Sequence, residues 1–508
     1  MGSAILKDGL GAALLSAALN HPDQPALWAD DETLTYRTLF ERAGALANVI
    51  RTLGVPAGQR IVILSHRTTS AYVSVIGALL AGCTYVPLNT RFPAERNMAI
   101  LKGSGAAALV LDAQAAQEID TLLGEPDGTL HVVTPDEAPG VATRFTLHRS
   151  PAPTSPLEAL EAVRVDPNLP CYLLFTSGTT GTPKGVPITH GNLGSYLPAI
   201  HKHVPIGASD RVLQCVDLTF DLSVHDMFLT WLNGAQLFSA PENASIFAPR
   251  LIARLGLTAS LLVPSTAARA QQEGLLGPDT MPTLRYSLFA GEALPVSIVE
   301  GWRHAAPNSA VFNLYGPTEG TIHTGWYKVD PSRPLTMPVV PIGWAVGGQR
   351  LEIFEAGKPV PAGETGEIYL TGPQMTPGYW QAPQLDAEKF TVINGVRWYK
   401  TGDLGRQSQE HGTIFAGRMD RQAASLTGEQ MTTLDTLKEI FGKYFEQSFD
   451  GFGEETLRTE IEKWDSTAHV GLVLEIERQF DIEFTPSELA RLTSVGAIRA
   501  LVDRKRAA

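Results

Sequence analysis

One run of this chain combines the residue types that hold phosphate groups. Residues 174–185 read Leu-Phe-Thr-Ser-Gly-Thr-Thr-Gly-Thr-Pro-Lys-Gly, so glycines and hydroxyl side chains are mixed ahead of Lys184. Glycine lets a backbone approach an anion closely, and hydroxyl and N–H groups donate to phosphate oxygens. The run follows an apolar, strand-like stretch, so it is expected at a strand-to-loop turn, and a merely flexible surface loop would not need this composition. It is not a GxxxxGK[ST] P-loop, because glycine follows Lys184.

The surrounding sequence predicts an α/β architecture that would position this run. Up to about residue 420, helical and strand patterns alternate with glycine and proline turns between them, which favours mainly parallel sheets covered by helices. The expected helices lie at residues 43–53 and 71–80, and the expected strands at 60–64, 84–88, 108–111, 211–215, 260–263, 286–290 and 310–314. Short alternating strands at 351–354, 366–370 and 413–416 predict a small β-rich subdomain within residues 338–416.

The composition changes near Gln422. Residues 422–431 are small and polar, as in a linker, and the chain beyond them has helical apolar spacing. The expected helices there span residues 432–449, 466–480, 485–492 and 495–502, and acidic side chains outnumber basic ones. We therefore expect a large α/β domain at 1–421, a linker at 422–431 and a small acidic four-helix bundle at 432–508.

Composition excludes several classes of protein. The formal net charge is −13, and the one basic cluster is residues 504–506, so a nucleic-acid partner is not expected. Cys83, Cys171 and Cys215 lie in or beside apolar stretches without metal or disulfide spacing, as reduced core thiols do. No run of 18 apolar residues and no signal-peptide pattern is present, which predicts a cytoplasmic protein without a membrane segment.

Seven further short segments are informative when their sequences and their order along the chain are taken together. They are residues 34–36 (Leu-Thr-Tyr), 81–88 (Ala-Gly-Cys-Thr-Tyr-Val-Pro-Leu), 220–228 (Phe-Asp-Leu-Ser-Val-His-Asp-Met-Phe), 313–319 (Asn-Leu-Tyr-Gly-Pro-Thr-Glu), 366–368 (Gly-Glu-Ile), 399–404 (Tyr-Lys-Thr-Gly-Asp-Leu) and 417–420 (Gly-Arg-Met-Asp). With the phosphate-type run, they resemble the core motifs of the adenylate-forming superfamily, which includes acyl-CoA synthetases, luciferases and the adenylation domains of nonribosomal peptide synthetases. The resemblance covers residues 10–422.

The resemblance implies a reaction and a set of roles. In this superfamily a carboxylate attacks the α-phosphate of ATP and pyrophosphate leaves, so the enzyme must align anions and neutralise phosphate charge. By resemblance, the catalytic residues would be Thr176, Lys184, Thr318 and Glu319, with Glu319 holding Mg²⁺. The residues that would bind the nucleotide are Ser177, Gly178, Thr179, Thr180, Gly291, Glu292, Tyr315, Asp403 and Arg418. Tyr315 would stack on adenine, Asp403 would accept from both ribose hydroxyls, and Arg418 would reach ribose or phosphate unless it only forms a surface ion pair.

Asp221 indicates the class of substrate. In amino-acid-activating relatives an aspartate at this place pairs with the α-ammonium group of the substrate, whereas the plainer alternative is a helix N-cap. The remaining pocket residues, transferred from the motifs, would be Leu222, His225, Leu262, Leu288, Ala290, Leu314, Ile322 and His323. This mainly apolar lining resembles pockets for small or medium apolar amino acids, proline above all and cysteine less closely. The two histidines are either structural or meet a polar tip of the substrate.

The C-terminal helices resemble a peptidyl or acyl carrier domain. Trp464-Asp465-Ser466-Thr467 would be its attachment site, with Ser466 carrying 4'-phosphopantetheine, although threonine stands where the usual pattern has leucine. Asp-Ser alone also matches many helix N-termini. The resemblance implies a phosphopantetheinyl transferase and downstream condensation or tailoring enzymes as partners, and acidic helices suit docking to basic surfaces.

One departure from the superfamily affects the expected activity. Relatives continue after the segment at 417–420 with a mobile C-terminal subdomain that bears a lysine for the α-phosphate, whereas here the carrier-like region follows almost at once. Three functions remain open. The chain activates an amino acid and loads it on Ser466, it is a catalytically impaired binding and carrier module that needs a C-terminal subdomain in trans, or it is an acyl-CoA synthetase-like acid ligase.

Overall fold

The computed structural model divides the chain into two compact units. The first is Met1–Arg418 and the second is Met419–Ala508. The described residues are 6–123, 130–136, 147–176, 183–241 and 247–419, and in the second unit 433, 436–438, 440–441, 472–473, 476, 479–480, 484 and 494–506. Within this part of the chain no helix has the length and hydropathy needed to cross a membrane.

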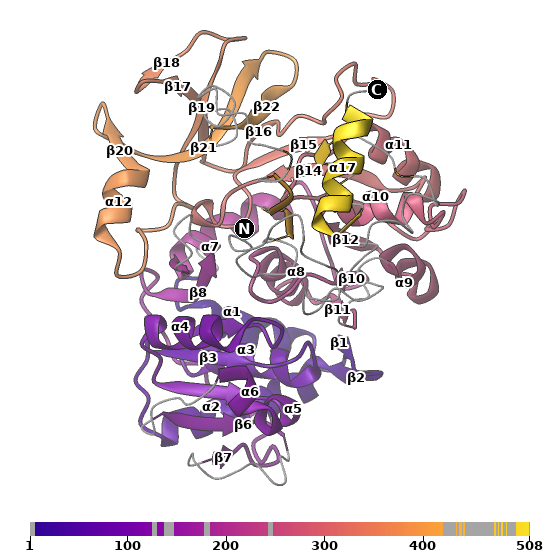
Figure 1. Cartoon of the computed structure of the whole chain (residues 1–508). Helices are drawn as coiled ribbons and strands as arrows, with labels where there is room; N and C mark the ends of the chain where they lie inside the picture. Colours follow the sequence, from indigo (N-terminus) through magenta and orange to yellow (C-terminus); the bar gives the residue numbers. More distant parts are fainter. Residues whose placement is uncertain are drawn as a thin grey trace. The chain divides into compact units, whose positions relative to one another are not determined.

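Two largely parallel sheets form the framework of the first unit (Figure 1). The seven-stranded sheet has the order β7-β6-β5-β3-β4-β8-β9, and only the β8–β9 pair is antiparallel. Its strands are β3 (Arg60–Leu64), β4 (Thr84–Leu88), β5 (Ala108–Leu111), β6 (His131–Thr134), β7 (Leu147–Arg149), β8 (Pro170–Thr176) and β9 (Lys184–Thr189). The apolar runs Arg-Ile-Val-Ile-Leu and Ala-Leu-Val-Leu are almost wholly buried, as expected for parallel strands covered on both faces.

The nine-stranded sheet has the order β16-β15-β14-β13-β12-β10-β11-β1-β2. Its middle strands, from β14 to β1, pair in parallel, and the pairs at both edges are antiparallel. The strands are β1 (Pro25–Ala29), β2 (Glu32–Thr35), β10 (Arg211–Gln214), β11 (Gln236–Ser239), β12 (Ala259–Leu262), β13 (Tyr286–Phe289), β14 (Ala310–Tyr315), β15 (Gly325–Lys328) and β16 (Trp344–Ala345).

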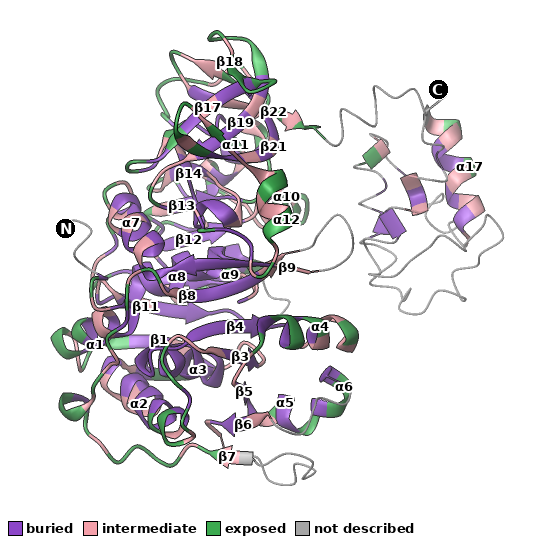
Figure 2. Ribbon diagram, turned by 90° about the vertical axis from the view of Figure 1, so that its left-hand side faces the viewer, coloured by how far each residue is buried: buried purple, intermediate pink, exposed green. Residues whose placement is uncertain are grey.

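Helices form a layer between the two sheets and a layer on each outer face. The central core unites both sheets with α1 (Leu10–Asn20), α2 (Tyr36–Thr52), α3 (Thr69–Leu80), α7 (His190–His201) and α8 (Leu222–Trp231). The outer face of the seven-stranded sheet packs on α4 (Ala94–Ser104), α5 (Ala113–Gln117) and α6 (Ile119–Leu123). The outer core of the nine-stranded sheet includes α9 (Ala248–Leu255), α10 (Pro264–Gln272) and α11 (Val296–Ala305). Figure 2 shows the inner strands of both sheets as mostly buried and many surface loops as exposed.

A small antiparallel sheet follows, as the short alternating strands predicted. Its order is β18-β17-β19-β21-β20, and β22 also pairs with β21. The elements are β17 (Arg350–Glu355), β18 (Lys358–Pro359), β19 (Thr365–Thr371), α12 (Pro383–Lys389), β20 (Phe390–Ile393), β21 (Val396–Ser408) and β22 (Gly412–Arg418). The 3₁₀ turns η1 (Leu157–Ala159) and η3 (Thr318–Gly320) lie earlier in the chain.

The second unit has its own small apolar cluster. Leu437, Ile440 and Phe441, which the helical spacing predicts to share a face, are buried with residues of α17 (Val495–Arg506). The helix predicted at 495–502 is α17, whereas most other residues of the predicted four-helix bundle, Ser466 among them, lie outside the described residues.

Most predicted elements of the first unit are present, and the differences have local causes. The helix expected to begin at Ala43 is α2, which begins at Tyr36 because the hydroxyl of Thr35 accepts from the backbone N–H of Thr38 at 3.2 Å and caps it. The strand expected at 260–263 is β12, one residue earlier. The antiparallel β9 was not predicted.

Candidate nucleotide and amino-acid site

Three of the predicted nucleotide-binding residues are joined by hydrogen bonds. The hydroxyl of Tyr315, at the end of β14, donates to Oδ2 of Asp403 at 2.6 Å, and Nη1 of Arg418 donates to Oδ1 of Asp403 at 2.8 Å. Asp403 and Arg418 are directly opposite in the antiparallel β21–β22 pair, where side chains on one face meet. The fold therefore brings residues 88 and 15 positions apart into one polar group.

This group lines a pocket of ≈ 270 Å³. Its walls are Gly291, Glu292, Ala293, Asn313, Leu314, Tyr315, Gly316, Pro317, Val339, Val340, Ile342, Asp403, Phe415 and Arg418. All five predicted residues of the base and ribose end are among them. The side chain of Glu292 is turned to α10, where it accepts from the backbone N–H and the hydroxyl of Ser265 at 2.8 and 2.9 Å. Gly291 and Glu292 are therefore held at the pocket edge by a helix-capping interaction.

The predicted phosphate end begins where β8 and β9 part. Thr176 and Lys184 pair across these strands, so the connecting run starts and ends at one place; Ser177, Gly178, Thr179 and Thr180 lie outside the described residues. The Nζ atom of Lys184 lies 5.7 Å from the centre of the Tyr379 ring, and the hydroxyl of Tyr379 donates to Oε1 of Glu319 at 2.5 Å. One tyrosine thus connects the two predicted catalytic groups.

Tyr379 was not predicted from the sequence. It follows a proline and a glycine without an obvious catalytic pattern, and its importance arises from long-range contacts. The backbone N–H of the next residue, Trp380, donates to the carbonyl of Gly185 at 2.8 Å, which fixes this segment to β9.

Glu319 suits a magnesium site that is completed by a ligand. Its residue is 6% exposed and lies in the η3 turn, and Tyr379 holds one of its carboxylate oxygens. The described residues contain no group of three or more His, Cys, Asp or Glu that could hold a metal by themselves. Mg²⁺ is commonly bound by one or two carboxylates together with substrate phosphates and water, so a single buried glutamate beside a phosphate site fits it.

Asp221 is a buried carboxylate rather than a helix cap. It stands at the N-cap position of α8 but forms no side-chain capping bond, its residue is 9% exposed, and its Oδ2 has no partner in the described part of the chain. Burial raises the pKa of Asp221 to about 7; the neighbouring Glu319 also raises it, and the Thr318 hydroxyl and the Ile322 backbone oppose the rise. An unsatisfied buried carboxylate is costly unless a cation pairs with it.

Five of the predicted apolar lining residues pack in the central core, and one does not. Leu222, Leu288, Ala290, Leu314 and Ile322 all belong to the central core. Leu262 does not, because it packs in the outer core on the opposite face of the sheet. Its successor Val263 packs against the central core, and a Cβ on Gly291 would lie 3.5 Å from Val263 Cγ1 and 4.0 Å from Leu222 Cδ1. Alternation along the chain turns Leu262 and Val263 to opposite faces of the sheet, so Val263, rather than Leu262, lies on the side of the central core.

The turn after η3 is strained where it meets this lining. Thr321 and Ile322 have φ of 60° and 70°, a region that is rarely adopted by β-branched residues. Such strain persists only where surrounding contacts impose it and is concentrated at functional sites. The next residue, His323, is fully buried, and so is His225 on α8.

The family assignment follows from this arrangement and from sequence comparison. A profile of the family described as AMP-binding enzyme matches residues 14–380, and a glycyl-adenosine-5'-phosphate complex is known for the similar adenylation domain AlmE of Vibrio cholerae, which is 33% identical with a TM-score of 0.75 over 81% of this chain and 79% of that one. The chain belongs to the AMP-binding enzyme family, and it is an adenylating ligase with an adenylation domain of the nonribosomal peptide synthetase type.

The similar proteins include synthases and a ligase. Syringomycin synthase SyrB1 of Pseudomonas syringae pv. syringae is 32% identical over 83% of this chain and 67% of its own length. D-alanine–D-alanyl carrier protein ligase of Bacillus cereus (strain G9842) is 31% identical over 80% of this chain and 78% of its own. The chain spans only 11% of surfactin synthase subunit 1 of Bacillus subtilis, at 31% identity. The structure of IdnL7 has a TM-score of 0.74 at 32% identity and covers 86% of both chains.

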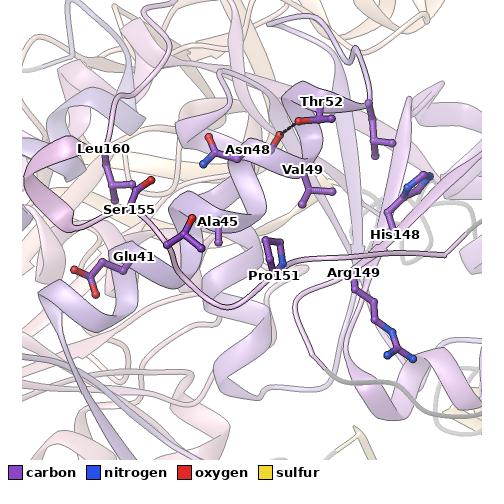
Figure 3. A pocket seen from close by; sticks show the side chains of 12 residues that line it. Glu41, Ala45, Asn48, Val49, Thr52, His148, Arg149, Pro151, Ser155 and Leu160 are labelled. Carbon is purple, nitrogen blue, oxygen red and sulfur yellow. Dashed lines mark hydrogen bonds between the residues drawn. The ribbon is translucent and has the colours of Figure 1, made fainter.

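Cavities larger than the nucleotide pocket lie elsewhere in the first unit. One of them, of ≈ 440 Å³, lies along α2 and is lined by Glu41, Ala45 and Val49 of that helix and by Pro151 and Ser155 (Figure 3). None of the predicted site residues lines it. The chemistry of the lining, rather than the volume, therefore identifies the nucleotide site.

Replacing Tyr379 with phenylalanine tests its connecting role. We expect Tyr379→Phe to lower the adenylation rate about tenfold and to raise the Mg²⁺ concentration for half-maximal rate, because Glu319 loses a charge-assisted hydrogen bond. Rates measured at a series of Mg²⁺ concentrations check this. Tyr369→Phe, at a buried tyrosine stacked on Phe354, is the matched control; equal Mg²⁺ curves for both variants would contradict the role.

Proposed function

We propose that the chain activates an amino acid with ATP and forms an aminoacyl adenylate. The observation that carries the proposal is Asp221, a buried carboxylate with an unpaired oxygen, beside the Thr318 hydroxyl and at the edge of the central apolar lining. An α-ammonium group would supply the missing cation, and its carboxylate would then extend toward Thr318 and the nucleotide pocket. An acid without an amino group would leave Asp221 unpaired, which disfavours an acyl-CoA synthetase-like ligase.

The proposed reaction is a displacement at the α-phosphorus. An oxygen of the substrate carboxylate forms a bond to phosphorus, the bond to the bridging oxygen breaks, and pyrophosphate leaves. Thr176, Thr318 and Lys184 would orient and neutralise the phosphates, while Asp403 and Tyr315 hold the ribose and base. Mg²⁺, when bound at Glu319, would supply further positive charge to the phosphate oxygens.

The lining limits the size and character of the substrate side chain. The predicted lining consists mainly of leucine, isoleucine and alanine side chains that pack in the central core, so the body of the substrate side chain is proposed to be apolar and small or medium in size. The resemblance to known pockets makes proline one candidate, and cysteine another.

We further propose that the activated residue is loaded on the second unit. Ser466 would carry 4'-phosphopantetheine, added by a phosphopantetheinyl transferase, and the arm would take the aminoacyl group as a thioester for condensation or tailoring enzymes. The similarity to the Bacillus cereus protein, a ligase for a carrier protein, supports such a partner. Ser466→Ala is expected to abolish labelling of the intact chain by a transferase and fluorescent coenzyme A, with ATP affinity unchanged. Labelling that persists in the variant would contradict the carrier assignment.

The proposed activity of the isolated chain is weak. The short segment at 422–431 stands where relatives have a subdomain with a catalytic lysine, so the rate would depend on another cation or on a subdomain supplied in trans. If the chain binds ATP and amino acid but adenylates only after such a subdomain is added, the impaired-module alternative holds.

Amino-acid-dependent ATP–pyrophosphate exchange tests the proposed function. The intact chain is assayed with each common amino acid, and with matched acids that lack the amino group. Exchange that requires one amino acid and fails with its deaminated analogue is the expected result. Exchange that is equally fast with the deaminated acid would overturn the proposal in favour of a general acid ligase.

The raised pKa of Asp221 predicts a pH dependence. An α-ammonium group binds the ionised carboxylate, so the affinity for amino acid should fall as the pH falls below about 7, up to about tenfold per pH unit. Isothermal titration with the amino acid between pH 6 and 8.5 measures this dependence. ATP affinity, measured in parallel, should change less; an amino-acid affinity that is flat across the range would contradict the pairing.

A further inference from the structure

Two buried histidines next to the predicted amino-acid lining share one hydroxyl group. The hydroxyl of Tyr196, on α7, lies 2.6 Å from Nδ1 of His225 and 2.8 Å from Nδ1 of His323. All three residues are at most 2% exposed, and the two imidazole rings are 5.5 Å apart between centroids. Both rings are therefore fixed by one partner rather than by separate contacts.

The shared hydroxyl determines the protonation pattern of both rings. Burial lowers the pKa of His225 to about 3 and that of His323 well below its usual range, so both are neutral at neutral pH. A tyrosine hydroxyl has one proton, and a neutral imidazole has one N–H. Tyr196 can donate to only one Nδ1, and the other ring must donate its Nδ1–H to the hydroxyl oxygen. The two Nε2 atoms are consequently of opposite character, since one carries a proton and the other is a lone-pair acceptor.

Several buried polar atoms near the two histidines have no hydrogen-bond partner among the described residues. Nε2 of His323 is buried and has no hydrogen-bond partner in the described part of the chain. A cavity of ≈ 10 Å³ adjoins His225 and Leu288, and it is also lined by Asp226 and Thr230. The carboxylate oxygens of Asp226 and the hydroxyl of Thr230 are likewise without partners among the described residues. Unpaired buried polar groups cost free energy. The unpaired Nε2 of His323, and the unpaired groups of Asp226 and Thr230 at the small cavity beside His225, therefore point to a polar partner at this end of the lining.

We propose that His225 and His323, set by Tyr196, recognise a substrate side chain that ends in a hydroxyl or thiol group. Such a group donates one hydrogen bond and accepts another, which matches a pair of Nε2 atoms of opposite character. The apolar lining would surround the carbon atoms of the same side chain. This inference rests on the proposed function, and within its substrate class it favours threonine, serine or cysteine over proline and over the apolar isosteres.

The difference in affinity between isosteric substrates distinguishes such a polar site from a purely apolar pocket. A hydrophobic pocket discriminates poorly against an added hydroxyl, whereas a site with polar groups built for that hydroxyl rejects the analogue that leaves them unpaired. We therefore expect the polar member of an isosteric pair to bind at least about tenfold more tightly than the apolar one.

Binding of aminoacyl sulfamoyl-adenosines to the intact chain provides the test, because it does not depend on turnover. The pairs are threonyl with valyl, seryl with alanyl, and cysteinyl with 2-aminobutyryl, and the prolyl analogue is included. Tighter binding of the polar member in at least one pair, and of that member over the prolyl analogue, is the expected result. Equal affinities within every pair, as when water alone occupies the polar end, overturn the inference but leave the proposed function standing. If none of these compounds binds more tightly than sulfamoyl-adenosine itself, the proposed function fails and the inference fails with it.

Tyr196→Phe examines the positioning role of the hydroxyl. The variant keeps the ring but frees both imidazoles to change tautomer, so the discrimination within the responding pair should fall to about threefold or less while the apolar member keeps its affinity. Tyr36→Phe is the matched control, because Tyr36 is also fully buried and its hydroxyl donates to the backbone carbonyl of Ala235 at 2.7 Å. Unchanged discrimination in Tyr196→Phe, or an equal loss in the control, would overturn the role of Tyr196.

Discussion

Asp221→Asn should abolish amino-acid activation and at the same time stabilise the protein. The amide cannot pair with an α-ammonium group, and removing one partner of a buried charge pair lowers affinity by roughly 10²–10³-fold. Amino-acid-dependent pyrophosphate exchange should fall by that factor, whereas ATP affinity should change little because Asp403, Tyr315 and Arg418 are intact. Exchange that survives in the variant would show that the ammonium group binds elsewhere.

The gain in stability follows from the direction of the pKa shift. The folded protein holds the Asp221 proton up to about pH 7, against an ordinary pKa of 3.8, so the folded state binds more protons than the unfolded state between these values. Stability is therefore lost as the pH rises through this window, by about 4 kcal/mol above pH 7. Asparagine carries no charge and avoids this loss. Melting temperatures of the two proteins should differ most at pH 8.5, in favour of the variant, and converge toward pH 5; a variant that melts lower at pH 8.5 would contradict the interpretation.

Asp403→Asn should have the largest effect on nucleotide binding. Asp403 receives hydrogen bonds from Tyr315 and Arg418 in the nucleotide pocket, and its carboxylate is proposed to accept from both ribose hydroxyls. Asparagine keeps the shape but replaces one acceptor with a donor and leaves Arg418 beside a neutral group. We expect the Kd for ATP, measured by isothermal titration, to rise about 100-fold.

A second aspartate–arginine pair in the same unit provides the control. Asp210 is 1% exposed and accepts from Nη1 of Arg285 at 2.8 Å and from the hydroxyl of Thr258 at 2.6 Å. Asp210→Asn should destabilise the fold as much or more, yet leave the Kd for ATP unchanged. An equal loss of ATP affinity in both variants would mean that Asp403 acts through stability rather than through contact with the nucleotide.

The sequence predicted much of the first unit because its strongest patterns are local. Apolar runs such as residues 60–64 and 108–111 match the strands residue for residue, since a parallel strand buried on both faces has to be apolar throughout. Helix ends were less accurate, as at α2, because a cap depends on one hydroxyl group rather than on a pattern.

Site residues that lie within a sequence motif could be assigned from the sequence. Residues that were assigned only from their position along a strand remained uncertain. Asp403, Tyr315 and Arg418 lie in ordered motifs, and they share a pocket. Leu262 was aligned outside a fixed motif, and a shift of one residue along a strand turns a side chain to the other face of the sheet. That is why Val263, and not Leu262, packs toward the central core.

The sequence by itself determined the class of this protein. Adenylation requires particular residue types, and the motifs that contain them can be recognised in their order along the chain without any knowledge of distances. Only the tertiary structure decided which of those residues contact one another and which are buried. It joined Lys184 and Glu319 through Tyr379, buried Asp221 with one carboxylate oxygen unpaired among the described residues, and placed two histidines on one tyrosine hydroxyl. Burial and hydrogen-bond partners set the charge and proton positions of these groups, and both depend on segments that are distant in the chain.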